Sequence, residues 1–328
     1  MLRFVSAIAL LALSAPAAPQ YALSGSIAGP DGGWDYAQVD PATDTLFVAR
    51  GDAVTAVDLA HGTSRSIGAI AKAHAVLPLP GGRLLVTSGN DASVRILDQA
   101  SGAERARIAV GKKPDAAVLN EDRSRAYVMN AKDGSVAEID TAAGKLVRTI
   151  AVRPGLESVV LVGNRLYANN EEANAIEVID LSAGKALAPI PLPGCDGPTG
   201  LGLDAKHGRL ISACANRKAA VVSLATRRQT ALVDIGGGPD AVIVDAARGL
   251  AFIPCGRDGT LDLLSLRGTG TVARIGRVKT EVGARTGAID PRSGALYLPT
   301  ARFSVPAPNT DRPVPLPGSF HVLIVRPA

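Results

Sequence analysis

The sequence predicts an all-β fold, a seven-bladed β-propeller made of four-stranded antiparallel blades. An Asp-x-x-x-Gly pattern recurs at 58–62, 98–102, 140–144 and 180–184, at spacings of 40, 42 and 40 residues. An aromatic or aliphatic residue also opens an earlier strand of every unit, at Phe47, Leu85, Tyr127, Tyr167, Ile211, Phe252 and Tyr297. Repeats of this length with short alternating or apolar runs are typical of propeller blades. Helical solenoids are excluded because the apolar residues do not recur at 3.6-residue spacing.

The third unit shows the strand pattern most clearly, with strands expected at 116–120, 126–129, 135–140 and 146–152. Its Asp133-Gly134 pair predicts a two-residue hairpin turn between the second and third strands, since such a turn needs positive φ angles. Asp258-Gly259 repeats this pair in the sixth unit.

The last unit offers only three strands, at 286–290, 295–299 and 320–325, and no strand follows Arg326. We expect residues 21–27 to supply the fourth, so that the N-terminal strand joins the last blade and closes the ring. Closure would remove the exposed sheet edges that invite aggregation.

Residues 1–17 precede this fold and have the features of a secretory signal peptide: a basic start, an apolar run at 4–13, and small residues at 15–17. Residues 18–328 then form a single propeller domain. No other stretch approaches the roughly 20 apolar residues of a membrane span. We expect a periplasmic or secreted protein that does not insert into the membrane after the signal peptide is removed.

The charge distribution argues against a nucleic-acid partner. The formal net charge is +5, the basic residues are scattered among acids, and the chain has only five Phe, five Tyr and one Trp. Nucleic-acid binding would need a clustered basic stripe with stacking aromatics. We expect a monomer whose partner is a small molecule or a protein.

Several segments resemble the YVTN/YncE-like β-propeller repeat family. They are Gly-Lys-Lys-Pro-Asp-Ala-Ala-Val at 111–118, Tyr-Val-Met-Asn at 127–130, Gly-Ser-Val at 134–136 and Gly-Lys-Leu-Val at 144–147. The resemblance spans all seven units and weakens toward the end, where Ser223 and Ser265 replace the third-strand Asp. It implies an exported bacterial propeller, and it implies little about chemistry because most members have no established reaction.

The residues just before the inner strands are candidates for a functional site, because these strands begin beside the central channel. Reading around the seven blades they are Asp35, His74, Asp115, Glu157, Thr199, Asp240 and Arg285. Six of the seven can ionise, which predicts a polar funnel that binds a small ligand or a protein partner. The alternative is that the acids only accept hydrogen bonds within their own turns.

Two chemistries fit this ring. In the first, His74, Asp115 and Glu157 hold a divalent cation, and a set of one imidazole with carboxylates suits calcium, magnesium or manganese better than zinc. In the second, Glu157 or His74 is the general base and Arg285 the oxyanion or carboxylate clamp of a lactonase- or lyase-like enzyme. A binding module is our leading hypothesis, an enzyme the second, and a passive scaffold the third.

A second ring is expected at the ends of the second strands, at Arg50, Ser88, Asn130, Asn170, Cys214, Cys255 and Thr300. Asn130 and Asn170 are more plausible as turn-stabilising residues than as ligands, whereas Arg50 could add positive charge opposite Arg285. Trp34 lies beside the first ring and could stack on a ligand or fill the core. The proline-rich insertion 302–318 could be a lid, a docking arm or a plain surface loop.

The cysteines predict one disulfide, Cys195–Cys214, with Cys255 left free. The rival pairing of Cys214 with Cys255 would join equivalent positions of adjacent blades, which should stand too far apart. The chain has no Cys-x-x-Cys-His motif, so covalently bound haem is not expected.

Overall fold

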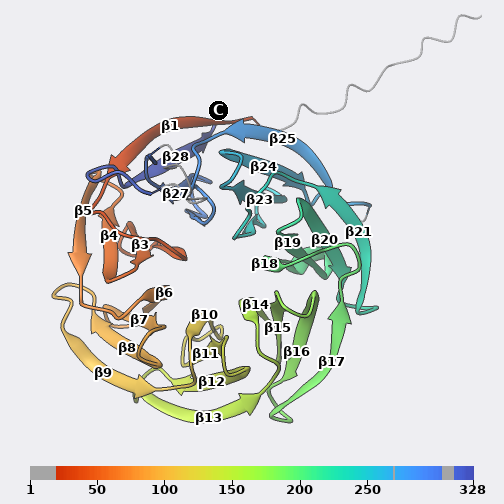
Figure 1. Ribbon diagram of the computed structural model, residues 1–328, viewed down its shortest axis with the longest axis horizontal. Helices are drawn as coiled ribbons and strands as arrows, with labels where there is room; N and C mark the ends of the chain where they lie inside the picture. The colour runs from red at the N-terminus through yellow and green to blue at the C-terminus, as the bar shows by residue number, and fades with distance from the viewer. Residues whose placement is uncertain (1–19, 269, 305–313) are drawn as a thin grey trace, which may run out of the picture.

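The computed structural model describes residues 20–268, 270–304 and 314–328. Seven sheets, each of four antiparallel strands, stand around a central channel (Figure 1). This arrangement confirms the predicted seven-bladed propeller. The predicted signal peptide, residues 1–17, lies outside the described residues.

Each blade runs from an inner strand at the channel to an outer strand at the rim. The inner strands are β2 (Ala37–Asp40), β6 (Ala73–Leu79), β10 (Pro114–Leu119), β14 (Leu156–Val162), β18 (Pro198–Asp204), β22 (Ile243–Asp245) and β26 (Ala288–Ile289). The second strands are β3 (Thr45–Arg50), β7 (Arg83–Ser88), β11 (Arg125–Asn130), β15 (Arg165–Asn170), β19 (Arg209–Cys214), β23 (Leu250–Cys255) and β27 (Leu296–Thr300). We number the blades 1 to 7 in this order.

The third strands are β4 (Ala53–Asp58), β8 (Ser93–Asp98), β12 (Ser135–Asp140), β16 (Ala175–Asp180), β20 (Lys218–Ser223), β24 (Thr260–Ser265) and β28 (His321–Pro327). The outer strands are β5 (Thr63–Ile67), β9 (Glu104–Ala109), β13 (Lys145–Ala151), β17 (Lys185–Pro191), β21 (Arg228–Asp234), β25 (Ala273–Lys279) and β1 (Tyr21–Ala28). In the described residues the only helix is the 3₁₀ turn Ala205–His207, and no helix there is long and apolar enough to cross a membrane.

The N-terminal strand closes the ring, as expected. β1 pairs antiparallel with β28 from Tyr21 opposite Pro327 to Ala28 opposite His321 (Figure 1). Tyr21 also packs edge-on against Phe252 of blade 6, with ring centroids 4.8 Å apart. The first described strand therefore contacts the two last blades of the chain.

The Asp-x-x-x-Gly repeats form the turns between third and outer strands. In the first copy, Asp58 Oδ1 accepts hydrogen bonds from the amides of Ala60 and His61, at 3.0 and 2.9 Å. Gly62 takes the left-handed corner with φ 67°. The repeat is thus explained by backbone geometry, because Asp caps the turn and Gly adopts a φ that costs other residues free energy.

The prediction of a two-residue hairpin at Asp133-Gly134 was wrong. Four residues, 131–134, join β11 to β12, and Gly134 has a positive φ whereas Asp133 does not. The Gly134 amide donates to the Asn130 carbonyl at 3.0 Å, which closes a wider turn. The Asp133 carboxylate instead accepts the amide of Lys112 at 2.6 Å, so its role is to tie two loops together.

The hydrophobic core lies between neighbouring blades. One cluster joins Phe47 and Val54 of blade 1 to Val76, Leu84 and Val86 of blade 2, all nearly or fully buried. Similar clusters fill the other interfaces, since alternate residues of each strand point to one face of the twisted sheet. Packing of this kind fixes where each inner strand begins, and with it the positions of the side chains around the channel.

The disulfide Cys195–Cys214 is present, with Cα atoms 5.3 Å apart, and Cys255 is free and buried. This confirms the predicted pairing. Burial raises the pKa of the Cys255 thiol to about 12, so it is a protonated core residue.

The insertion in the last blade joins β27 to β28, and its core, 305–313, lies outside the described residues. At its base Ser304 and Arg302 exchange backbone hydrogen bonds with Val314 and Leu316. The carboxylate of Asp31 accepts the amides of Ser319 and Phe320, both at 3.2 Å. These bonds hold the described ends of the insertion beside the segment that enters blade 1.

Candidate functional site at the channel mouth

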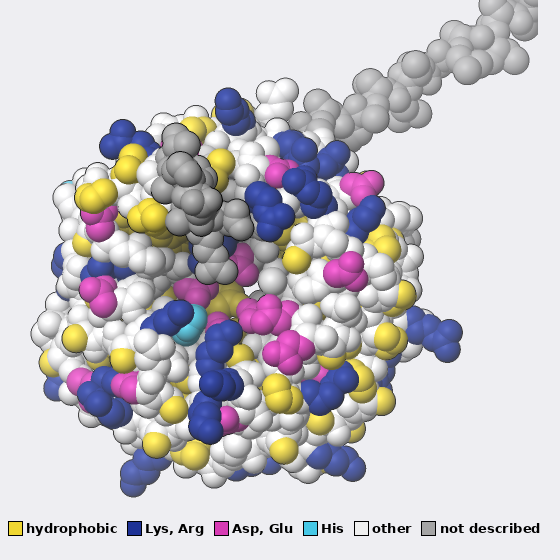
Figure 2. Space-filling model, viewed as in Figure 1, with side chains coloured by type: hydrophobic (Ala, Val, Ile, Leu, Met, Phe, Trp, Pro, Cys, Tyr) yellow, Lys and Arg dark blue, Asp and Glu magenta, His cyan; other side chains and the backbone are white. Residues whose placement is uncertain are grey.

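The predicted ring residues gather at one end of the channel. His74, Asp115, Glu157 and Thr199 are each the second residue of an inner strand, while Asp35, Asp240 and Arg285 lie shortly before one. Figure 2 shows acidic side chains around the centre of this face, with a histidine and basic side chains beside them. Side chains from different blades therefore meet at the channel mouth.

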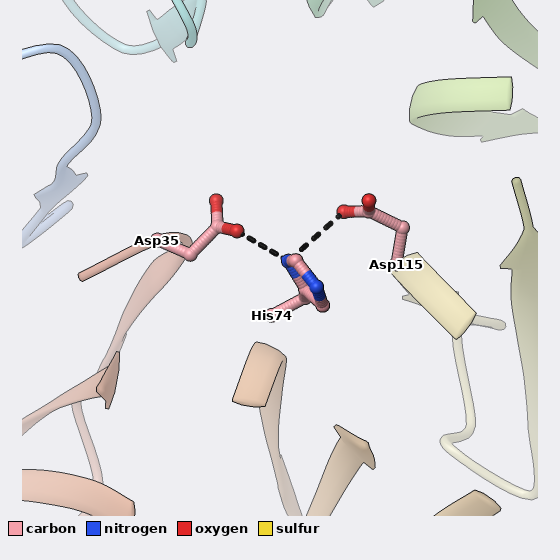
Figure 3. A group of neighbouring side chains, drawn as sticks. All are labelled: Asp35, His74 and Asp115. Carbon is pink, nitrogen blue, oxygen red and sulfur yellow. Dashed lines mark hydrogen bonds and ion pairs between the residues drawn. The ribbon is translucent and has the colours of Figure 1, made fainter. Parts of the chain in front are cut away.

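Three of these residues form a compact group in blades 1 to 3. His74 Nδ1 lies 2.6 Å from Asp35 Oδ2 and 3.7 Å from Asp115 Oδ1 (Figure 3). The second ring nitrogen of His74 points away from both carboxylates. One potential ligand atom from each residue lies within 4.8 Å of the others, which suits a shared cation. The sequence-based metal set contained His74 and Asp115, but the structure brings Asp35 to them rather than Glu157.

The ionisation of this group is shifted by burial and by neighbouring charges. Burial lowers the pKa of His74, but the hydrogen bond with Asp35 and the charge of Asp115 outweigh it, so the pKa lies above its usual value. Burial and the Asp115 and Asp240 charges raise the pKa of Asp35 to about 6, against the opposing effect of His74. The raised pKa favours the protonated imidazole, whose Nδ1 faces both carboxylates.

Asp115 is buried, with 6% of its side chain exposed, yet its contacts are loose. Besides His74, its polar neighbour is Lys113 Nζ, 3.4 Å from Oδ2. A buried polar group normally has at least one hydrogen-bond partner, and a buried charge needs close partners because its desolvation is costly. Asp115 therefore has capacity for a further cationic partner.

Glu157 lies on the other side of Lys113, whose Nζ is 3.9 Å from Oε1. Burial and the charge of Asp115 raise the pKa of Glu157 to about 9, so its carboxyl group is protonated at neutral pH. Burial lowers the pKa of Lys113, but Asp115 and Glu157 raise it more, and the ammonium stays charged.

Arg285 belongs to a second group, which joins blades 6 and 7 to the segment that enters blade 1. Its Nε donates to Asp240 Oδ2 at 2.9 Å, and Nη2 donates to the Trp34 carbonyl at 2.9 Å. The guanidinium also stacks on the Trp34 ring at 5.7 Å, and the ring packs against Phe303 and Phe320. Burial raises the pKa of Asp240 despite the charge of Arg285. Trp34 is only 6% exposed and forms part of the core.

The ring acids do not cap their own turns. Among the described residues, none of the carboxylates of Asp35, Asp115, Glu157 and Asp240 accepts a hydrogen bond from a backbone amide. Asp58, in a repeat turn, accepts two. The alternative explanation of the ring acids as turn residues therefore does not describe their contacts.

Tyr36 was missed by the sequence analysis. It follows Asp35 and packs against the apolar cluster of blades 3 and 4, so its ring reaches across the channel. Burial raises the pKa of its phenol well above the usual value, and the charges of Glu157 and Asp115 add to this. Its signal was present: the equivalent residues in the other blades are all small, at Ala75, Ala116, Ser158, Gly200, Ala241 and Thr286.

The second ring does not join this cluster. Arg50 forms an ion pair with Asp52 at 2.8 Å and a hydrogen bond with Ser66 at 3.2 Å, so its charge is directed along blade 1. Asn130 and Asn170 donate to Ser135 Oγ and the Pro154 carbonyl, at 3.0 and 2.8 Å. Of the remaining members, Ser88 and Thr300 donate to backbone carbonyls, Cys214 is in the disulfide and Cys255 is buried. Thr199 of the first ring also makes a structural bond, to the Pro239 carbonyl at 3.0 Å.

Comparison with known proteins supports the fold and leaves the function open. No protein-family profile and no curated protein sequence matches this chain. Among solved structures, a chain of Kuenenia stuttgartiensis hydrazine synthase matches with a TM-score of 0.71 and 18% sequence identity, covering 81% of this chain and 92% of that one. At this identity the similarity shows a shared propeller fold.

Proposed function

We propose that this protein is a binding module whose channel mouth holds a divalent cation through Asp35, His74 and Asp115. The observation that carries the proposal is the single imidazole nitrogen, Nδ1 of His74, facing carboxylates from both neighbouring blades. A metal ion in place of the Nδ1 proton would contact two anionic oxygens and one nitrogen. Manganese accepts both donor types, whereas calcium and magnesium prefer oxygen.

The charge balance supports this assignment. Asp35, Asp115 and Asp240 lie near two fixed cations, Lys113 and Arg285, and Arg285 is already paired with Asp240. The buried Asp115 has no contact shorter than 3.4 Å with a cationic group of the described residues. A bound cation would supply the positive charge that the Asp115 carboxylate lacks at close range. Coordination positions of the cation that the protein leaves open would let it contact a small molecule or a protein partner.

Elemental analysis by plasma mass spectrometry tests the proposal on mature protein purified without chelator. We expect near-stoichiometric metal, or saturable Mn²⁺ binding by calorimetry, that is lost in His74→Ala and Asp115→Asn. Asp234→Asn is the matched control, since it removes one acid from the exposed outer strand β21. Absence of metal and of Mn²⁺, Ca²⁺, Mg²⁺ and Zn²⁺ binding in the folded protein would overturn the proposal.

A lactonase- or lyase-like enzyme is the second candidate. The His74–Asp35 contact favours it, because a carboxylate that orients an imidazole is a recurrent general-base arrangement. Arg285 contacts Asp240 and Trp34 in the other group, so a substrate would have to span the channel mouth to use it as a clamp. Turnover of a lactone panel that Asp35→Asn abolishes would favour this candidate over simple binding.

Export and membership of the YVTN/YncE-like family also belong to the proposal. The disulfide Cys195–Cys214 is consistent with an oxidising compartment. Expression of the full chain followed by fractionation and intact mass measurement tests this: the mature protein should appear in the periplasm or the medium with its N-terminus near residue 18. A cytoplasmic protein that retains residues 1–17 would contradict it.

A further inference from the structure

A second, oppositely charged feature lies beside the acidic group. A pocket of about 410 Å³ is lined by Lys72, Lys112, Lys113 and Lys132, together with His74, Gly89, Asn90 and Ala92. Figure 2 shows basic side chains next to the histidine near the centre of the same face. The pocket spans blades 2 and 3, so its charge comes from loops of two blades.

Within the described part of the chain, three of the four lysines have no acidic partner. Lys72, Lys112 and Lys132 form no ion pair with any residue in the described part of the chain, whereas Lys113 is shared between Asp115 and Glu157. The nearby Asp133 carboxylate accepts the backbone amide of Lys112, at the edge of the pocket. The pocket therefore carries excess positive charge.

The backbone at two of these lysines is unusual. Lys72 has φ 69° and Lys113 has φ 51°, both in the left-handed region. Each lies two residues before its ring residue, His74 or Asp115. The same position is a glycine in the other five blades, at Gly33, Gly155, Gly197, Gly238 and Gly283. In blades 4 to 7 these glycines have φ of 88°, 57°, 68° and 94°.

Shared hydrogen bonds confirm that these positions are equivalent. The carbonyls of Lys72 and Lys113 accept the amides of Gly89 and Ala131, at 2.8 and 2.9 Å. The carbonyl of Gly155 likewise accepts the Glu171 amide at 3.0 Å in blade 4. Blades 2 to 7 thus adopt left-handed backbone at this position, where glycine costs least, whereas Gly33 of blade 1 does not. Only the two blades that flank the pocket depart from glycine, and both depart to lysine.

We propose that this lysine pocket binds a small oxyanion carrying more than one negative charge, such as a phosphate or a polycarboxylate. Strained backbone retained at two adjacent blades indicates a use for the side chains it carries. Lysine ammonium groups on flexible stems are suited to oxyanions. No aromatic residue lines the pocket, so stacking on a sugar or base is not provided by the described residues.

The anion site is argued independently of the cation site, although His74 borders both. Its test is therefore carried out on the full mature protein that has been stripped of metal with chelator and then dialysed free of the chelator, so that failure of cation binding does not affect the result. Calorimetry with inorganic phosphate and, separately, with citrate is compared for the wild type, Lys72→Gly, Lys132→Gln and the double variant. Lys185→Gln is the control, because it removes one exposed charge from the outer strand of blade 4.

We expect saturable binding of phosphate or citrate by the wild type, weakened by added salt. Lys72→Gly and Lys132→Gln should each raise the Kd about fivefold, the upper range for one exposed ion pair, and Lys185→Gln should leave it unchanged. Lys72→Gly should also melt no lower than the wild type, because glycine suits this φ. The anion that binds more tightly distinguishes a phosphate site from a polycarboxylate site.

Two outcomes would overturn the proposal. One is the absence of phosphate and citrate binding at millimolar concentration by the folded wild type. The other is an unchanged Kd in the double Lys72→Gly, Lys132→Gln variant, which would place any observed binding elsewhere on the molecule. Because Lys132 is an exposed loop residue, its substitution keeps the test valid even if Lys72→Gly perturbs the loop.

Discussion

His74 Nδ1 lies 2.6 Å from Asp35 Oδ2, and this contact joins blade 1 to blade 2 at the channel mouth. A proton on Nδ1 would occupy the place that a metal ion would take. Proton and metal therefore compete for one position, and the competition makes the proposed cation site sensitive to pH.

Cation affinity should rise with pH across the slightly acidic range. Asp35 must be ionised to bind a cation and its pKa is raised to about 6, while His74 must lose its proton and its pKa lies above the usual value. Below about pH 6 both groups hold protons, so Mn²⁺ binds weakly. Calorimetry in buffers of different ionisation enthalpy should show proton release on binding, and an affinity independent of pH would contradict the site.

Glu157→Gln should flatten the dependence of stability on pH. The folded protein keeps the Glu157 proton up to about pH 9, whereas a glutamate in the unfolded chain loses it near its ordinary value of 4.5. Between these values the native state binds one more proton, so stability falls as pH rises, by about 1.4 kcal/mol per pH unit. The amide of the substituted side chain cannot ionise, and this part of the slope should disappear.

Chemical denaturation between about pH 6 and pH 8 measures the two slopes. Glu172→Gln is the control, because Glu172 is exposed in the loop after β15 and should leave the slope unchanged. Equal slopes for the wild type and Glu157→Gln would show that Glu157 ionises normally in the folded protein.

The seven-bladed ring and its closure could be predicted from the sequence because the turns within each blade depend on a few residues close together in the chain. Asp58 and Gly62 repeat in other blades since each turn needs the same cap and the same positive φ. The hairpin at Asp133-Gly134 was mispredicted for the same reason. A dipeptide specifies only a preference, and here the tertiary bond from the Lys112 amide to Asp133 selected a wider turn.

The members of the site were predictable, but their grouping was not. Aligning the repeats identifies His74, Asp115 and Glu157 as neighbours in the ring, yet side-chain length and direction decide which atoms meet. Glu157 extends toward Lys113, and the shorter Asp35 reaches His74 from the blade on the other side. The role of Tyr36 in the channel could have been predicted, since Tyr36 is the one large residue at a repeat position that is small in the other six blades.

Tyr36→Ala should lower stability and open the channel beneath the ring acids. Tyr36 packs against apolar residues of blades 3 and 4, so truncation removes contacts that tie blade 1 to the far side of the ring. The side chain is half-buried, and we expect a loss of about 2 kcal/mol, less than for a fully buried aromatic. Tyr36→Phe keeps the ring and should stay within about 0.5 kcal/mol of the wild type. Equal losses in both variants would assign the effect to the hydroxyl instead.

Removing the disulfide should destabilise the protein without changing the site. Cys195 and Cys214 enclose a loop of 19 residues, for which the chain-entropy relation gives about 3 kcal/mol. Cys195→Ser, Cys214→Ser should show this loss in denaturant, and so should the reduced wild type. Cys255→Ser in the oxidised protein keeps the disulfide and measures the cost of replacing a buried cysteine by serine, so that this cost can be subtracted from the effect of losing the crosslink. A reduced wild type as stable as the oxidised form would show that the crosslink contributes nothing.

Ring closure by β1 predicts unequal effects along one strand. Tyr21 is 8% exposed and packs edge-on against Phe252 of blade 6, whereas Leu23 of the same strand is 45% exposed. Tyr21→Ala should therefore cost about 3 kcal/mol and Leu23→Ala less than about 0.5 kcal/mol. Thermal melts of the two variants give the comparison directly. If β1 only covers an edge, through backbone bonds that both variants retain, the two losses will be the same; a larger loss for Tyr21→Ala shows that the strand also locks blade 7 to blade 6.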